Sequence, residues 1–423
     1  MKLFSLINGR KILIENILSL STIQFLNYLF PFITFSYLVR VLGVEKFGLI
    51  NFAAAFIGYF VLITDYGFNI SAVRLISIQR NEKQKLNELV SSIYTIKFIL
   101  FVISLLIFIL ISLSIEIFRN EFQLYAFTFL TVIGNVFLPV WFYQGIEKTK
   151  FIAIVTLIVR LFWVVSVFTF VKNSNDYNLL ALINSLQSIL IGLSLFILLF
   201  IKFGVKFKLS SFNTIKEQVK DGGMIFISSC AISLYTISNT FILGLLTSNT
   251  IVGYFAAADK IRQAIQNLLL PFTQAMYPHV SKLFNESKLL AKKFVMKSFK
   301  FIGGFSFLIS FLTFIFAKQI VLILVGDNYL QSVNVLRIIS FLPFIIYLSN
   351  LFGIQTMLNL KFNREFTLII SLAALVNIIL SFVLIPFWKE TGSALAVLLT
   401  EIIVTGSITL FLLRRGFFKI NEI

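Results

Sequence analysis

The sequence FIAIVTLIVRLFWVVSVFTFV occupies residues 151 to 171, with Lys148 and Lys150 just before it and Lys172 directly after it. A helix needs about 20 mainly apolar residues to cross the hydrocarbon core of a bilayer. This stretch is long enough, its single charge is Arg160, and basic residues mark both ends, where a membrane meets water. It predicts a membrane-spanning helix.

The composition of the whole chain agrees with a membrane protein. Of the 423 residues, 58% are apolar and 13% are charged, whereas soluble domains have about 45 to 50% and about 25%; this excludes a soluble enzyme. A single cysteine, Cys230, and a single histidine, His279, leave no disulfide framework, Cys-based metal site or His cluster. The net charge of +18 would indicate nucleic acid in a soluble chain. Here the basic residues lie between apolar runs, so they are interpreted as membrane anchors, and no nucleic-acid partner is expected.

Further runs of bilayer length follow the same pattern, separated by short polar breaks. Together they predict an all-α polytopic membrane protein with twelve transmembrane helices. The first run is too long for the apolar core of a signal peptide and lacks a small-residue cleavage pattern, so we treat it as the first helix. The runs are 12–39, 47–68, 93–117, 122–145, 151–171, 179–201, 224–246, 252–277, 299–325, 335–358, 366–388 and 392–413.

A long basic break divides these runs into two sets of six. It predicts an N-terminal six-helix bundle over 1–201, a basic cytoplasmic linker over 202–223 and a C-terminal six-helix bundle over 224–423. The fragment Phe-Ala-Ala-Ala occurs at 52–55 in the second run and at 255–258 in the eighth, the equivalent run of the second set. Because six is even, such repeats are parallel, an arrangement that favours alternating access between the two halves.

The basic residues also predict the orientation. Most of the 36 Lys and Arg lie at the N-terminus, in the even-numbered breaks and in the C-terminal tail. Cytoplasmic loops retain such residues, so both termini are expected in the cytoplasm. The break 279–297 carries leucines and phenylalanines among its lysines, and it is either a solvated loop or an interfacial helix on anionic membrane lipids.

Several charged residues fall inside the predicted spans, where a charge is costly and indicates a cavity or a partner. Arg160 lies ten residues beyond Lys150, which is about 15 Å into a core about 30 Å thick. Arg262 and Glu401 reach a similar depth from the opposite side. The shallower charged residues, near the cytoplasmic end, are Lys97, Glu15 and Asp65.

The eighth run carries a polar stripe that a lipid-facing helix would not tolerate. Its members recur at three- and four-residue spacing, so one face of a helix would hold them all. Two structural alternatives stay open: polar faces often join helices in bundles, and Asp259 with Arg262 could form an internal ion pair. The stripe consists of Asp259, Arg262, Gln263, Gln266, Asn267 and Gln274.

Six further segments carry a resemblance to a known family. They are Tyr37 to Gly43 followed by Phe47-Gly48, Thr64-Asp65-Tyr66-Gly67 with Arg74, Trp141 to Glu147, Gly253 to Lys260, Tyr277-Pro278-His279, and Gly353 to Met357. In these segments the chain resembles bacterial polysaccharide-repeat-unit (O-antigen, Wzx-type) flippases, and the likeness extends over nearly the whole length.

The resemblance implies the multidrug, oligosaccharidyl-lipid and polysaccharide exporter superfamily, whose fold is two six-helix bundles around a central cavity. It implies a multi-pass protein of the bacterial cytoplasmic (inner) membrane that is not an enzyme and has no catalytic residues. The implied substrate is an undecaprenyl-pyrophosphate-linked oligosaccharide, moved from the cytoplasmic to the outer leaflet for polysaccharide biosynthesis. The implied protein partners are the polysaccharide polymerase and the chain-length machinery.

A pyrophosphate headgroup needs cationic partners in a low-dielectric cavity. The predicted substrate-binding residues are Arg160, Lys260 and Arg262 with Gln266, while Lys97 and Arg40 are predicted gate or entry contacts.

No phosphate-binding loop for ATP is present, and no cofactor or metal is expected. Energy would therefore come from a proton or sodium gradient or from removal of the product. The carboxylates predicted to act in ion coupling or gating are Asp65, Asp259, Glu401 and Glu15.

Two other functions remain as alternatives. An ion-coupled multidrug or cation exporter of the same superfamily would need an acidic cavity, whereas the mid-membrane set here is more basic than acidic. A polytopic polymerase or glycosyltransferase would display a large external loop with catalytic groups. The longest external break, 326–334, offers only one carboxylate, Asp327.

Overall fold

The computed structural model describes the backbone of residues 2–208 and 212–419, and the side chains from Phe30 onward apart from scattered positions. All regular elements within these ranges are helices. The chain forms two compact units, each described here by itself. The N-terminal unit comprises Met1–Leu42 and Ala53–Cys230, and the C-terminal unit comprises Gly43–Phe52 and Ala231–Ile423.

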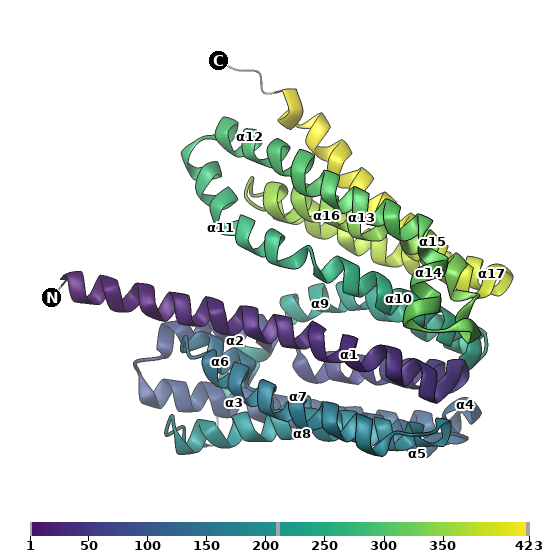
Figure 1. Cartoon of the computed structure of the whole chain (residues 1–423). Coiled ribbons are helices and arrows are strands. Elements are labelled where there is room, and N and C mark those ends of the chain that lie inside the picture. The colour runs from purple at the N-terminus through teal and green to yellow at the C-terminus, as the bar shows by residue number, and fades with distance from the viewer. Residues whose placement is uncertain (1, 209–211, 420–423) are drawn as a thin grey trace. The chain divides into compact units, whose positions relative to one another are not determined.

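Helices α1 to α8 come from the first half of the chain (Figure 1). Helix α1 is two helices joined at Gly43, whose positive φ of 71° is easily adopted only by glycine. The bounds are α1 Lys2–Asp65, α2 Phe68–Gln79, α3 Lys83–Ser114, α4 Glu116–Arg119, α5 Phe122–Phe137, α6 Val140–Gly145, α7 Lys150–Phe170, the 3₁₀ helix η1 Ser174–Asp176, and α8 Tyr177–Ile201.

The second half contains α9 to α17 and two π-helical segments, η2 and η4. Helix α17 is also two helices, joined at Lys389. The bounds are α9 Phe212–Leu246, α10 Asn249–Asn267, α11 Leu270–Glu286, α12 Lys288–Ser298, η2 Phe299–Gly303, α13 Gly304–Ile315, α14 Ala317–Leu324, η3 Asp327–Tyr329, α15 Ser332–Ile339, α16 Leu342–Ser349, η4 Asn350–Met357, α17 Asn363–Arg414 and η5 Phe417–Lys419.

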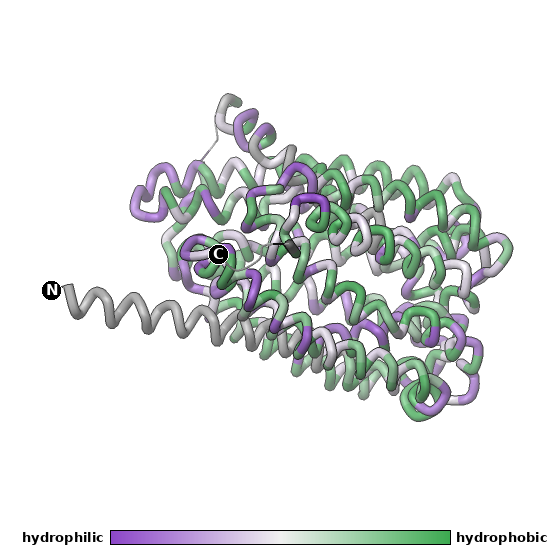
Figure 2. The backbone as a smooth tube through the Cα atoms, turned by 90° about the horizontal axis from the view of Figure 1, so that it is seen from above, coloured by the Kyte–Doolittle hydropathy of each residue, from purple (hydrophilic) through white to green (hydrophobic). Residues whose placement is uncertain are grey.

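The helices confirm the predicted all-α polytopic membrane protein. Eight helical stretches of the described residues are long and apolar enough to cross a membrane, and two of them, Phe32–Gln79 and Asn363–Arg414, contain the kinks. Figure 2 shows hydrophobic residues along the lengths of the helices and hydrophilic ones at many of the turns. The stretch α10–α11 is not among the eight, because its polar stripe lowers its hydropathy. The central cavity stays a prediction.

Small residues hold α5 and α8 together in the N-terminal unit, where the two helices run side by side (Figure 1). A Cβ added at Gly192 would fall 2.2 Å from the carbonyl oxygen of Gly134, so the two backbones touch. Hydroxyl groups join the same contact: the oxygens of Thr131 and Ser185 lie 2.9 Å apart. Such small-residue contacts are typical of helix pairs in membranes, where close packing replaces the hydrophobic effect.

A second close approach lies in the C-terminal unit, between the segment Gly43–Phe52 and helix α10. A Cβ on Gly48 would fall 1.8 Å from the carbonyl oxygen of Asn249, and one on Gly253 would fall 2.2 Å from that of Val44. These distances are far below van der Waals contact, so only glycine fits at both positions. The start of the second predicted span is therefore packed directly on the eighth.

The two long basic breaks, 202–223 and 279–297, both contain helical residues. Residues 205–208 run along α3, where the amides of Lys206 and Lys208 donate to Asn87 Oδ1 and Ser91 Oγ, each at 3.0 Å. Residues 209–211 of the predicted linker lie outside the described residues, and from Phe212 the chain is already α9. The break 279–297 is also helical, in α11 and α12. A solvated loop is thus wrong for 279–297, and the contact with anionic lipids stays a prediction.

Candidate functional site

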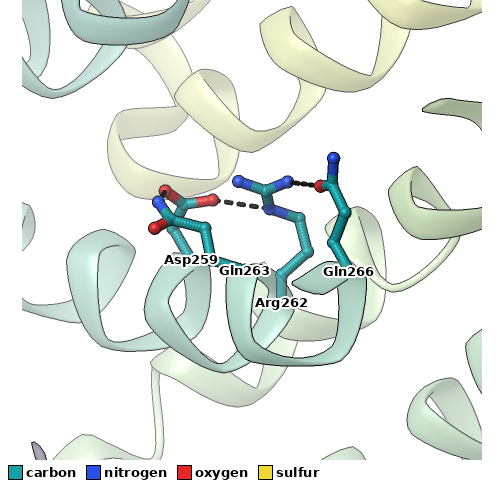
Figure 3. A network of polar contacts seen from close by, with 4 residues as sticks. All are labelled: Asp259, Arg262, Gln263 and Gln266. Atoms are coloured by element: carbon teal, nitrogen blue, oxygen red, sulfur yellow. Dashed lines mark hydrogen bonds and ion pairs between the residues drawn. The ribbon is translucent and has the colours of Figure 1, made fainter. Parts of the chain in front are cut away.

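A polar network lies along one face of α10 (Figure 3). Arg262 Nε donates to Asp259 Oδ1 at 2.7 Å, and Gln263 Nε2 donates to Asp259 Oδ2, also at 2.7 Å. Arg262 also donates through Nη1 to Gln266 Oε1. The Arg262 and Asp259 side chains are mostly buried, with 13% and 23% exposed. The ion pair that the sequence left open as an alternative is present, so the positive charge of Arg262 is compensated within its own helix.

The network leaves N–H donors of Arg262 that a ligand can use. A guanidinium has five N–H donors, and among the described residues Asp259 and Gln266 take two of those of Arg262. The amide nitrogen of Gln266 adds further donors beside them. A ligand with several acceptor oxygens, such as a phosphate, matches this set of donors.

The predicted single stripe of the eighth span is wrong in one respect. The helix is interrupted after Asn267, and α11 begins at Leu270 with Pro271 in its first turn. Proline is favoured there because the first amides of a helix lack partners in any case. Gln274 therefore lies on a different helix from the network, and its side chain is exposed.

Lys260 and Arg40 have exposed side chains. Lys260 follows Asp259 directly on α10, about 100° further around the helix, so it leaves the face of the network. Arg40 lies three residues before the kink at Gly43. The structure places neither residue in a buried polar site.

Arg160 is half-buried on α7, away from the most exposed face of that helix. The exposed face carries apolar residues such as Ile154, Leu161 and Val165. Thr156, four residues earlier and on the same side of α7, is buried. Arg160 therefore lies on the side of the helix that packs on other helices. Arg160 belongs to the N-terminal unit and Arg262 to the C-terminal unit.

Lys97 and Asp65 come together inside the N-terminal unit. Lys97 is 1% exposed, and its Nζ donates to the carbonyl oxygen of Asn135 at 2.8 Å. The charge of Asp65 acts on the Lys97 ammonium. Asp65 also accepts a hydrogen bond of 2.7 Å from Asn69. The ammonium of Lys97 is therefore engaged by the protein itself.

Glu401 is buried on α17, with 4% of its surface exposed. Its depth in the membrane stays a prediction. The side chain of Glu15, the remaining predicted coupling carboxylate, lies outside the described residues.

A buried chain of uncharged side chains was missed by the sequence analysis. Ser381 donates to Asn239 Oδ1 at 3.0 Å, Asn239 Nδ2 donates to Asn377 Oδ1 at 3.2 Å, and Asn377 Nδ2 donates to Thr400 Oγ1 at 3.0 Å. All four residues are buried, and they join α9 to both parts of α17. The four-residue spacing of Asn377 and Ser381 within an apolar run was the signal that could have revealed them.

Within the described residues, His, Cys, Asp and Glu side chains do not gather in groups of three that could hold a metal ion. The polar clusters of the two units consist of individual charged and amide side chains. In the C-terminal unit the structure brings together Asp259, Arg262 and Gln266, and in the N-terminal unit it brings together Asp65 and Lys97.

The fold has known counterparts among transporters. The chain is similar to the lipid II flippase MurJ in an inward closed conformation, with a TM-score of 0.76 and 15% identity, over 95% of this chain and 89% of that one. It is also similar to an inward-facing multidrug resistance transporter of the MATE family, with a TM-score of 0.70 and 12% identity, over 93% of this chain and 96% of that one. At these identities the likeness concerns the fold alone.

The sequence itself has closer relatives. The chain is 33% identical to a protein of Escherichia coli described as "Putative O-antigen transporter", over 94% of this chain and 96% of the relative. It is 28% identical to a protein of Shigella dysenteriae with the same description, over 92% and 97%. Residues 13–284 match the family described as polysaccharide biosynthesis protein. These matches confirm the resemblance drawn from the sequence motifs: the chain belongs to the polysaccharide biosynthesis protein family.

Proposed function

We propose that this protein is a flippase that moves undecaprenyl-pyrophosphate-linked oligosaccharide repeat units from the cytoplasmic to the outer leaflet, by alternating access with a cationic central cavity. The observation that carries the proposal is the 33% identity to an O-antigen transporter over 94% of the chain. The fold shared with a lipid II flippase supports it, because that protein is also named for moving a lipid-linked substrate. The relatives are named as transporters, and we propose no enzymatic activity for this chain.

The substrate has two parts that the chain must accommodate, a lipid pyrophosphate and an oligosaccharide. A pyrophosphate needs several N–H donors and positive charge in a low-dielectric site. Arg262 with Gln266 offers such donors in the C-terminal unit, and Arg160 offers a mid-membrane guanidinium in the N-terminal unit. We propose that these residues contact the pyrophosphate during transport, with Lys260 and Arg40 as contacts at entry.

The test uses proteoliposomes that contain a fluorescent undecaprenyl-pyrophosphate oligosaccharide. We expect wild-type protein to move the lipid between leaflets and Arg160→Ala with Arg262→Ala to lose most of this activity while the protein stays folded. Arg337→Ala is the matched control, because Arg337 is an exposed arginine of α15 outside the proposed site. A wild-type protein that moves no such lipid but exports organic cations would instead establish the drug-exporter alternative.

We propose that transport is coupled to an ion gradient through the buried or half-buried carboxylates Asp65, Asp259 and Glu401. Glu401 is the best candidate for a proton, since a carboxylate at mid-membrane depth can exchange a proton as the environment changes. We expect Glu401→Gln to flatten the pH dependence of the transport rate. Glu365→Gln, near the start of α17, should keep the wild-type profile. Identical pH profiles for wild type and Glu401→Gln would contradict the role of Glu401.

The cellular setting follows from the same proposal. We place the protein in the bacterial cytoplasmic (inner) membrane with both termini in the cytoplasm, on the distribution of its 36 Lys and Arg. The basic helix α12 would then lie against anionic lipids of the inner leaflet. The polysaccharide polymerase and the chain-length machinery would act on the delivered repeat units.

A further inference from the structure

Two spans of the N-terminal unit are broken, and the pieces beyond the breaks pack on each other. The second span ends at Asp65, turns through Tyr66 and Gly67, and continues as α2. The fourth span ends with α5 and continues after Pro139 as α6. Helices α2 and α6 are in contact, and a Cβ added at Gly145 would fall 2.5 Å from the Ile76 side chain. An ion pair of 3.0 Å between Arg80 and Glu147 joins their far ends.

Pro139 creates a specific defect at the second break. In a continuous helix the amide of residue 139 would donate to the carbonyl oxygen of Asn135, four residues earlier. Proline has no N–H, and it also holds the preceding Leu138 in an extended conformation. The Asn135 oxygen therefore loses the donor four residues ahead and keeps from the backbone a bond of 3.3 Å from the amide of Leu138. Inside the unit a poorly satisfied carbonyl is costly.

Helix α3 supplies side-chain donors at this break. Lys97 Nζ donates to the Asn135 oxygen at 2.8 Å, and Tyr94 Oη donates to the Phe137 oxygen at 3.0 Å. These two residues are three positions apart, so they lie on the same face of α3. A cation is also favourable at this point, because the C-terminal end of α5 carries the negative end of the helix dipole.

The same ammonium lies within electrostatic reach of the first break. Asp65, the last residue of α1, acts electrostatically on Lys97. Asp65 in turn accepts a hydrogen bond from Asn69 in the first turn of α2. Lys97 is fully buried, so removing its ammonium would leave the Asn135 oxygen without this donor inside the unit.

We propose that Lys97 is a positioning residue that replaces the amide missing at Pro139 and thereby holds the paired helices α2 and α6 in place on the N-terminal unit. It acts on transport through these helices and does not touch the substrate. The inference differs from the sequence prediction, which placed Lys97 at the entry for substrate.

The first test is a double-mutant cycle in thermal stability, which requires no substrate. Lys97→Met removes the donor and keeps the shape of the side chain, so we expect the Tm to fall by about 5 °C. Pro139→Ala restores a backbone amide that can donate to the Asn135 oxygen. In that background we expect Lys97→Met to lower the Tm by less than half as much.

Two controls give the cycle its specificity. Pro386→Ala removes a proline within α17 of the other unit, so its effect should add to that of Lys97→Met. Lys148→Met removes an exposed lysine of the same unit and should leave the Tm unchanged. Additive effects of Lys97→Met and Pro139→Ala, or an unchanged Tm for Lys97→Met, would overturn the proposal.

A second test separates positioning from substrate contact, and it rests on the proposed function. In the proteoliposome assay we expect Lys97→Met to lower the maximal transport rate about tenfold with the half-saturating substrate concentration unchanged. A raised half-saturating concentration at an unchanged maximal rate would mark Lys97 as a substrate contact and overturn the inference. Failure of wild-type protein to move the lipid would refute the proposed function alone, because the stability cycle stands without transport.

Discussion

Replacing Gly48 by alanine is expected to prevent the C-terminal unit from folding properly. The new Cβ would lie 1.8 Å from the carbonyl oxygen of Asn249 and 2.6 Å from the amide nitrogen of Gly253, so the segment and α10 must move apart. Both neighbours are backbone atoms, which cannot turn aside as a flexible side chain can. Overpacking of this kind costs about 3 kcal/mol or more.

The separation would also disturb the packing around Phe52. Its ring stacks on that of Phe241, with centroids 5.7 Å apart, and it lies against Gly244. The measurement is the yield of monodisperse protein in detergent and its Tm, both of which should fall strongly for Gly48→Ala.

Gly406→Ala is the matched control for Gly48→Ala. A Cβ at Gly406 in α17 would meet no atom within 4 Å, and alanine is the better helix former. We therefore expect this variant to keep or slightly raise the Tm. If Gly48→Ala proved as stable as Gly406→Ala, the close approach between the segment and α10 would be wrong.

Loss of Arg262 is expected to reduce transport by about 10- to 100-fold, the value of one charge-assisted hydrogen bond to a phosphate. The difficulty is that Arg262→Ala also leaves Asp259 as an unpaired buried charge, which could impair the protein for structural reasons. The double variant Asp259→Ala with Arg262→Ala removes both charges together and resolves this ambiguity.

The double variant gives opposite results for the two roles. If Arg262 binds the pyrophosphate, the double variant stays as inactive as Arg262→Ala. If the pair serves only the stability of α10, removing both charges restores most of the transport and the Tm. Transport by the double variant at the wild-type rate would thus contradict the substrate role of Arg262. The control is Gln263→Ala, which removes a hydrogen bond to Asp259 and should leave transport largely intact.

The architecture was predictable because a bilayer imposes a strict length on apolar helices. The all-α polytopic class follows from runs such as 151–171, which needs no partner to be recognised. The spacing of Asp259 and Arg262 also indicated that an ion pair was possible, since residues three apart on a helix are neighbours. Local periodicity was sufficient for both.

Features that depend on neighbours from distant parts of the chain could not be predicted in this way. Nothing in the sequence around Lys97 shows that Asn135 lies beside it, because that contact depends on how α3 packs on α5. The hydrogen bonds of Asn239 with Asn377 likewise join helices 138 positions apart. The helical nature of 279–297 was obscured by its lysines, which occur equally in loops and on the polar side of a helix.

The segment Gly43–Phe52 has a consequence for biosynthesis. It belongs to the C-terminal unit, yet it leaves the ribosome long before α10, the helix that packs on Gly48. Domains commonly fold as they emerge, starting from the N-terminal one. In the nascent chain, the segment Gly43–Phe52 therefore cannot reach its final packing until the eighth span has been inserted. Neither half can complete its fold as an independent product of translation.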